Sequence, residues 1–256
     1  MNAQARLRAT EDVRTGSDTS RFGCALCAGL NLNICQPGVE GHGPGRARPT
    51  PIRQSGHTVS ARRIISRGQD LRDTVPVICS GWAAAIVMLS DGSRQIVSFL
   101  LPGDIVSTTL LFDSSLYSQI EAVTDVHYRT FDRIELTSIM YKQPGLLEKI
   151  SSAWVEEKAR ADQLIVDLGR RTADERIARL ILNLASRLAK RDMVRGDPME
   201  FDFPLRQHHI ADATGLTPVH VSKVLTEFRR RGMISISERS MTILDPVGFG
   251  RIANMR

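Results

Sequence analysis

The segment from Leu205 to Gly232 limits the folds open to this chain more than any other, because it has the spacing of two short helices joined by a tight turn. Ala211, Gly215 and Val221 follow one another at intervals of four and six residues, as in a helix-turn-helix. The first must be small where the second helix crosses it, and glycine supplies the left-handed backbone that ends the first helix. We therefore predict a helix-turn-helix here.

The second helix of this motif is predicted to begin at Thr217, a good N-cap residue, with Pro218 as its first helical residue. One face should be buried, and it consists of Val221, Val224, Leu225 and Phe228. Another face would enter the DNA major groove, and it consists of Val219, Ser222, Lys223 and Thr226. Phosphate contacts are expected from Thr217, Arg229, Arg230 and Arg231.

Two short segments after this helix, Met233–Ser237 and Met241–Leu244, are predicted to form a wing. The alternative is an ordinary helical hairpin with a solvated basic end. The coincidence of spacing, cap, segregated faces, arginines and wing favours binding of double-stranded DNA. A net charge of +6, from 34 Lys and Arg against 28 Asp and Glu, agrees with a polyanionic partner.

Residues 57 to about 141 have a different pattern, with short apolar runs separated by Gly68, Gly81, Gly92 and Gly103. The Asp91-Gly92 pair between two of these runs is typical of a tight hairpin. Strands at this regular spacing indicate an all-β barrel, roll or sandwich.

After Pro144-Gly145 the apolar period becomes helical. Residues at seven-residue spacing predict a two-stranded coiled-coil seam with Glu157 as one polar interruption. The predicted dimer-interface residues are Leu147, Ile150, Trp154, Ala161, Leu164 and Leu168. The alternative is an amphipathic helix packed on its own domain. Thr172 and Glu175 then form a capping box at the start of another helix.

Three motifs together resemble the Crp/Fnr family of bacterial regulators: RQIVSFLLPGD (Arg94–Asp104), DERIARLILNLASRL (Asp174–Leu188) and ADATGLTPVHVSKVL (Ala211–Leu225). The resemblance implies an α+β chain with a double-stranded β-roll, a dimerisation helix and a C-terminal winged helix-turn-helix. It also implies a homodimer that reads a two-fold symmetric DNA site and contacts RNA polymerase. The expected divisions are a flexible tail (1–52), the roll (53–143), the dimerisation helix (144–171) and the DNA-binding domain (172–256).

Two departures from the family pattern affect function. Many members have Arg-Glu-Thr near the start of the recognition helix, whereas this chain has Pro218-Val219-His220, so the half-site should differ. Members that bind cyclic nucleotides neutralise the phosphate with an arginine after a Gly-Glu pair. Here no arginine follows Gly103-Asp104 until Arg129, so no cyclic nucleotide is expected.

The four cysteines suggest a redox input. Cys24, Cys27 and Cys35 lie close together near the N-terminus, and Cys79 lies in the predicted roll. Oxygen-sensing members of the family hold a [4Fe–4S] cluster on three N-terminal cysteines and one in the roll, which suits thiolate chemistry. The spacing here is irregular for that cluster. Zinc, a metal-free thiol switch and cysteines without a function remain alternatives.

Other function classes receive less support. A regulator controlled by abundance or by an unknown ligand is the main alternative. A cupin-like metalloenzyme would need several inward His and carboxylate ligands, but between His57 and Tyr141 the only other histidine is His127. We therefore expect a protein that is not an enzyme. With no apolar block at the N-terminus and no long apolar stretch, we also expect it to be cytoplasmic.

Overall fold

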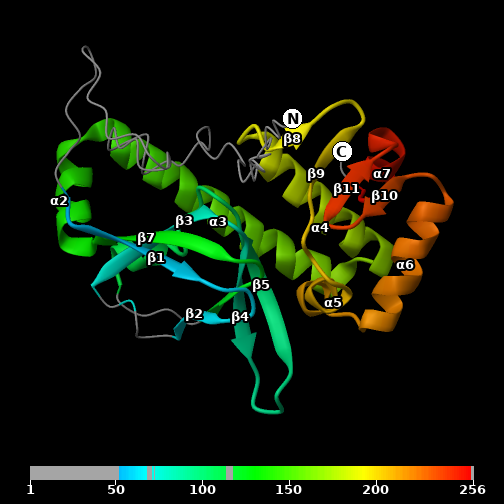
Figure 1. The fold of residues 1–256 in the computed structure, drawn as a ribbon, viewed down its shortest axis with the longest axis horizontal. Helices are drawn as coiled ribbons and strands as arrows, with labels where there is room; N and C mark the ends of the chain where they lie inside the picture. The colour runs from blue at the N-terminus through cyan, green and yellow to red at the C-terminus, as the bar shows by residue number, and fades with distance from the viewer. Residues whose placement is uncertain (1–51, 68–70, 72, 114–117, 255–256) are drawn as a thin grey trace, which may run out of the picture.

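The computed structural model describes residues 52–67, 71, 73–113 and 118–254. The predicted tail therefore lies almost entirely outside the described residues, as do Cys24, Cys27 and Cys35. In the described part, a β-roll is followed by long helices and a winged helix-turn-helix (Figure 1), which confirms the predicted α+β fold.

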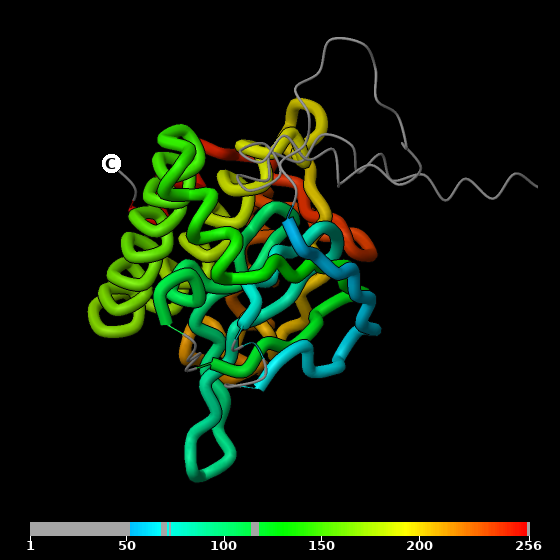
Figure 2. The backbone as a smooth tube through the Cα atoms, turned by 90° about the vertical axis from the view of Figure 1, so that its left-hand side faces the viewer, coloured from blue at the N-terminus to red at the C-terminus, as the bar shows by residue number. Residues whose placement is uncertain are grey.

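The roll consists of two antiparallel sheets. One has the order β1-β7-β3 and the other β2-β6-β4-β5. Their strands are Gln54–Val59 (β1), Ile64–Arg67 (β2), Thr74–Ser80 (β3), Ala83–Met88 (β4), Arg94–Leu100 (β5), Gln119–Ala122 (β6) and Val126–Asp132 (β7). The predicted hairpin joins β4 to β5, and Gly92 takes a φ of 85° in its turn. This hairpin projects from the body of the molecule (Figure 2).

Helices connect the roll to the C-terminal part. They are a 3-10 turn over Thr108–Leu111 (η2), Arg133–Lys142 (α2), Pro144–Arg170 (α3) and Ala173–Ala189 (α4). The predicted capping box at the start of α4 is present, since the Thr172 hydroxyl accepts from the Glu175 amide and the Glu175 carboxylate accepts from the Thr172 amide. The helix α3 runs along the roll towards α4 (Figure 1).

The C-terminal part begins with two short strands, Val194–Arg195 (β8) and Met199–Asp202 (β9). The helices of the motif are Gln207–Thr214 (α5) and Pro218–Arg230 (α6), and the wing is Ile234–Ser237 (β10) with Ser240–Ile243 (β11). The four strands form one sheet of order β10-β11-β9-β8. A last helix, Pro246–Ile252 (α7), was not expected from the sequence.

One hydrophobic core joins the roll to the DNA-binding part. Ile86, Ile96 and Phe99 from β4 and β5 belong to the same buried cluster as Ile210 and Ala211 from α5. The sequence patterns gave no sign of this contact, because periodicity identifies an apolar face but not the element that covers it. Within the described residues, no helix combines the length and apolar character needed to cross a membrane.

Candidate nucleic-acid interface

The turn between α5 and α6 has the predicted geometry. Gly215 ends α5 with φ 65° and ψ 36°, a left-handed conformation that glycine adopts at little cost. The Thr217 hydroxyl accepts a hydrogen bond from the His220 amide at 3.2 Å and caps α6. Val221 and Phe228 are fully buried, and the Phe228 ring packs edge-on against Phe249 of α7. These buried contacts therefore fix the orientation of α6.

The residues predicted to read DNA share one open surface. Val219 is 66% exposed, Lys223 and Thr226 are exposed, and Ser222 is half-buried. They line a shallow hollow whose full set of residues is Gln207, Pro218, Val219, Ser222, Lys223, Thr226 and Glu227. A base edge can therefore approach the predicted residues without displacing other parts of the chain.

The predicted phosphate-binding arginines lie at the end of α6. The Arg229 guanidinium donates to the Thr226 hydroxyl at 3.2 Å, and Arg230 forms a two-bond ion pair with Glu227, each bond 2.7 Å long. The pair holds the pKa of Glu227 below its ordinary value, chiefly through the hydrogen bond from Arg230. Solvent screens exposed pairs of this kind and they contribute little to stability, so a phosphate can compete for Arg230.

His209 acts as a cap rather than as a ligand. Its Nδ1 accepts from the Arg206 amide at 3.1 Å, within the first turn of α5. Burial, followed by the charges of His208, Arg94 and Arg206, lowers the pKa of His209 to about 4. His209 is therefore a neutral imidazole in the first turn of α5.

Polar contacts reinforce the docking of the roll on α5. Arg94 of β5 lies 3.5 Å from the Asp212 carboxylate and 3.3 Å from that of Glu121. The neighbouring Gln95 side chain donates to the Ala213 carbonyl at 3.5 Å. The first helix of the DNA-binding motif is thereby connected to a strand of the roll.

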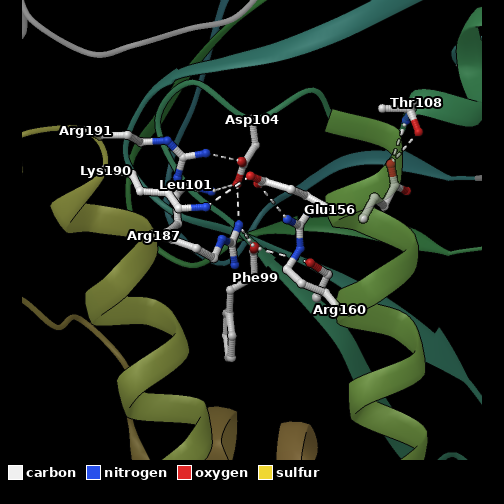
Figure 3. Close-up of polar contacts among 11 residues, drawn as sticks. Phe99, Leu101, Asp104, Thr108, Glu156, Arg160, Arg187, Lys190 and Arg191 are labelled. Carbon is white, nitrogen blue, oxygen red and sulfur yellow. Dashed lines mark hydrogen bonds and ion pairs between the residues drawn. The ribbon is translucent and has the colours of Figure 1, made fainter. Parts of the chain in front are cut away.

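A second connection is a buried ion cluster between the roll and α4 (Figure 3). The Asp104 carboxylate lies 2.5 Å from Arg187 and also contacts Arg191, while it accepts from the Leu101 amide at 2.7 Å. Arg187 donates in addition to the Phe99 carbonyl at 2.8 Å. Burial by itself raises the pKa of Asp104, but the two arginines outweigh it and hold that pKa below its ordinary value.

The predicted dimer residues of α3 form two neighbouring rows that differ in exposure. Leu147, Trp154 and Ala161 are exposed, with Trp154 at 56%. Ile150 is buried in the chain's own cluster with Leu136 and Met140 of α2, so it is not available to a partner in this structure.

The C-terminal half of α3 also packs against the chain itself. Leu164 and Leu168 are half-buried and line a cavity of about 200 Å³ between α3, α4 and β5. Glu157, predicted as a polar interruption of the seam, instead accepts hydrogen bonds from Ser107 and Thr108 of the roll. The seven-residue repeat does not distinguish these two rows of residues, because both have the same spacing.

The family follows from comparison with known proteins. The chain matches the Crp-like helix-turn-helix domain over residues 175–252 and the cyclic nucleotide-binding domain over residues 57–143. It is 30% identical to the nitrogen fixation regulation protein FixK of Bradyrhizobium diazoefficiens, over 77% of this chain and 81% of that protein. The chain belongs to the Crp/Fnr family.

Two further Crp/Fnr proteins extend the comparison. The transcriptional activator protein FnrA of Stutzerimonas stutzeri is 27% identical over 99% of this chain and 98% of its own length. The solved structure of FixK2 from Bradyrhizobium japonicum shares the fold with a TM-score of 0.67 and 23% identity, over 80% of this chain and 98% of that chain. The chain is therefore a DNA-binding transcription regulator, and not an enzyme such as the cupin considered above.

Cys79 is the one member of the predicted metal set that lies among the described residues. It sits in β3, is 7% exposed, and its thiol lies 3.8 Å from the Val77 carbonyl. No group of three or more His, Cys, Asp or Glu residues suited to a metal ion occurs in the described ranges.

Proposed function

We propose that this Crp/Fnr regulator acts as a homodimer that reads a two-fold symmetric DNA site, with RNA polymerase as its partner in transcription. The open face of α6 is the observation that carries the proposal, because one such face can read only half a site. Two copies related by a two-fold axis would place their recognition helices in successive major grooves, roughly 34 Å apart.

The outward side of α3 supports the dimer. Leu147, Trp154 and Ile165 lie on one side of this helix and remain 38%, 56% and 70% exposed in the single chain. A row of large apolar side chains along a helix is costly to leave in water, at about 25 cal/mol for each Å². Packing two copies of α3 against each other would remove this surface from solvent.

The dimer and its symmetric site can be tested together. We expect sedimentation equilibrium to give a dimer, and a selected palindromic duplex to bind far more tightly than a duplex with one half-site. Trp154→Glu should shift the protein to monomer and abolish the preference for the palindrome, whereas Glu148→Gln, an exposed change on the same helix, should not. A wild-type monomer that binds single half-sites with full affinity would contradict the proposal.

The assignment of the two DNA-contacting groups needs a separate test. Lys223→Ala should reduce discrimination at one position of each half-site by about 1–3 kcal/mol, because a lysine on the groove face can donate to guanine. Arg230→Ala should instead weaken all duplexes similarly and lower the salt dependence by about one phosphate contact. Identical behaviour of the two variants in fluorescence anisotropy would overturn the assignment.

We further propose a redox or oxygen input through Cys24, Cys27 and Cys35, with Cys79 as the fourth ligand. The match to FnrA is the observation that favours it, because that alignment spans nearly the whole chain and so reaches the N-terminal cysteines. A [4Fe–4S] cluster would supply oxygen sensitivity, since thiolates bind iron and the cluster reacts with oxygen.

Anaerobic purification separates the possible forms of this input. A brown protein containing iron and sulfide that bleaches in air would support the cluster, and bound zinc in colourless protein would support a structural metal. Metal-free protein whose DNA affinity depends on oxidation, with the dependence lost in Cys27→Ser, would indicate a thiol switch. Metal-free protein with equal affinity in both conditions would refute a redox input and leave abundance or an unknown ligand as the control.

A further inference from the structure

Glu157 of α3 makes a set of polar contacts with the Ser107–Thr108 segment of the roll. Its carboxylate accepts from the Thr108 amide at 3.0 Å, from the Thr108 hydroxyl at 2.6 Å and from the Ser107 hydroxyl at 3.1 Å. Thr108 is 2% exposed and Ser107 is 7% exposed, so these donors have little access to water. Figure 3 shows Thr108 facing α3 at this contact.

This arrangement satisfies the donors of the Ser107–Thr108 segment with a negative charge from the same chain. Buried amides and hydroxyls need an acceptor, and a carboxylate is roughly twice as strong a partner as a neutral group. The segment lies in the part of the chain that matches the cyclic nucleotide-binding domain. A phosphate brought to these donors would be repelled by the Glu157 carboxylate, and the segment 103–113 contains no arginine that could neutralise it.

We propose that Glu157 is a built-in anionic ligand of the roll, which holds α3 in the orientation that dimerisation requires without a bound nucleotide. Together with the buried Ile150, the Glu157 contact turns one side of α3 towards the roll. The neighbouring row of residues on the helix, with Leu147 and Trp154, is then left facing solvent. This inference rests on the proposed dimer, because the orientation of α3 matters only if a second copy packs on it.

The contact can be broken from either partner. Glu157→Gln keeps the size of the side chain but removes its charge, and Thr108→Val removes one donor and keeps the shape. Each should lower the dimer association constant about tenfold, because only the fraction of protomers with α3 held in place is competent to associate. The double variant should be little worse than either single variant, since both remove the same contact. Glu148→Gln, an exposed change on α3, is the matched control.

Amide hydrogen exchange on the same samples separates this inference from the proposed dimer. Loss of the contact should speed exchange around residues 107–111 and 153–161 whether the protein is monomeric or dimeric. In Glu157→Ala, sodium acetate should reverse part of this change relative to sodium chloride at equal ionic strength, whereas wild-type protein should not respond.

The outcomes are distinct. A wild-type monomer would refute the dimer, and the exchange data would still test whether Glu157 holds α3. Unchanged exchange in both Glu157→Gln and Thr108→Val, or additive effects of the two changes on association, would overturn the inference. If Glu157→Gln fails to fold, hydrogen exchange and association of Thr108→Val provide the same comparison from the roll side.

Discussion

Replacing Asp104 by Asn should destabilise the fold strongly, because among the described residues Asp104 is the carboxylate that pairs with the buried Arg187 and its neighbour Arg191. Arg187 is 8% exposed and also donates to the Phe99 carbonyl. Removing one partner of a buried ion pair typically costs about 3–5 kcal/mol, since the remaining charge stays out of water. Arg191 lies nearer the surface and can turn to solvent, so we expect the lower end, about 3 kcal/mol.

The measurement is urea unfolding followed by circular dichroism, with the melting temperature as a second readout. For a chain of this size, about 3 kcal/mol corresponds to a fall in Tm of roughly 6–12 °C. Asp104→Asn combined with Arg187→Met should recover most of the loss, because it removes the buried charge of Arg187 and Arg191 can turn to solvent. Glu156→Gln is the control in the same region, since Glu156 pairs at 3.0 Å with an exposed Lys190 and should cost less than about 1 kcal/mol.

Two results would refute this reasoning. The first is a loss below about 1 kcal/mol for Asp104→Asn, which would mean that the cluster behaves like an exposed pair. The second is additivity of Asp104→Asn and Arg187→Met, which would mean that the two side chains do not depend on each other.

Two further predictions concern the helix-turn-helix. Gly215→Ala should cost about 1–2 kcal/mol for its left-handed backbone. A further loss is expected because the new Cβ would lie 3.2 Å from the Leu168 side chain. Gly92→Ala, which is also at positive φ but has no neighbour within 4 Å, is the control that measures the backbone cost alone in thermal unfolding. The folded-state pKa of His209 is about 4 against an ordinary 6.5, so the unfolded chain binds the proton first and stability should fall as pH drops from about 6.5 towards 4. His209→Gln should flatten this slope in denaturant titrations, and an unchanged slope would assign it to other groups.

Local patterns were sufficient wherever the chemistry lies within a few residues. The left-handed Gly215, the cap at Thr217 and the capping box of α4 were all predicted, because each depends on side chains that contact the backbone of the next turn. The buried face of α6 followed from helical periodicity for the same reason. The strands of the roll could be located from glycine spacing and the Asp91-Gly92 turn, although not their order in two sheets.

The sequence by itself therefore determined the winged helix-turn-helix, the buried and exposed faces of its second helix, and the family. Only the tertiary structure decided how the DNA-binding part is attached to the roll. Glu157 meets Thr108 from 49 residues away, and Asp104 meets Arg187 from 83 residues away. A single sequence cannot pair such residues, because their contact depends on how sheets and helices pack and not on any periodic pattern. Glu157 thus fitted a coiled-coil position in the sequence and became a roll contact in the fold.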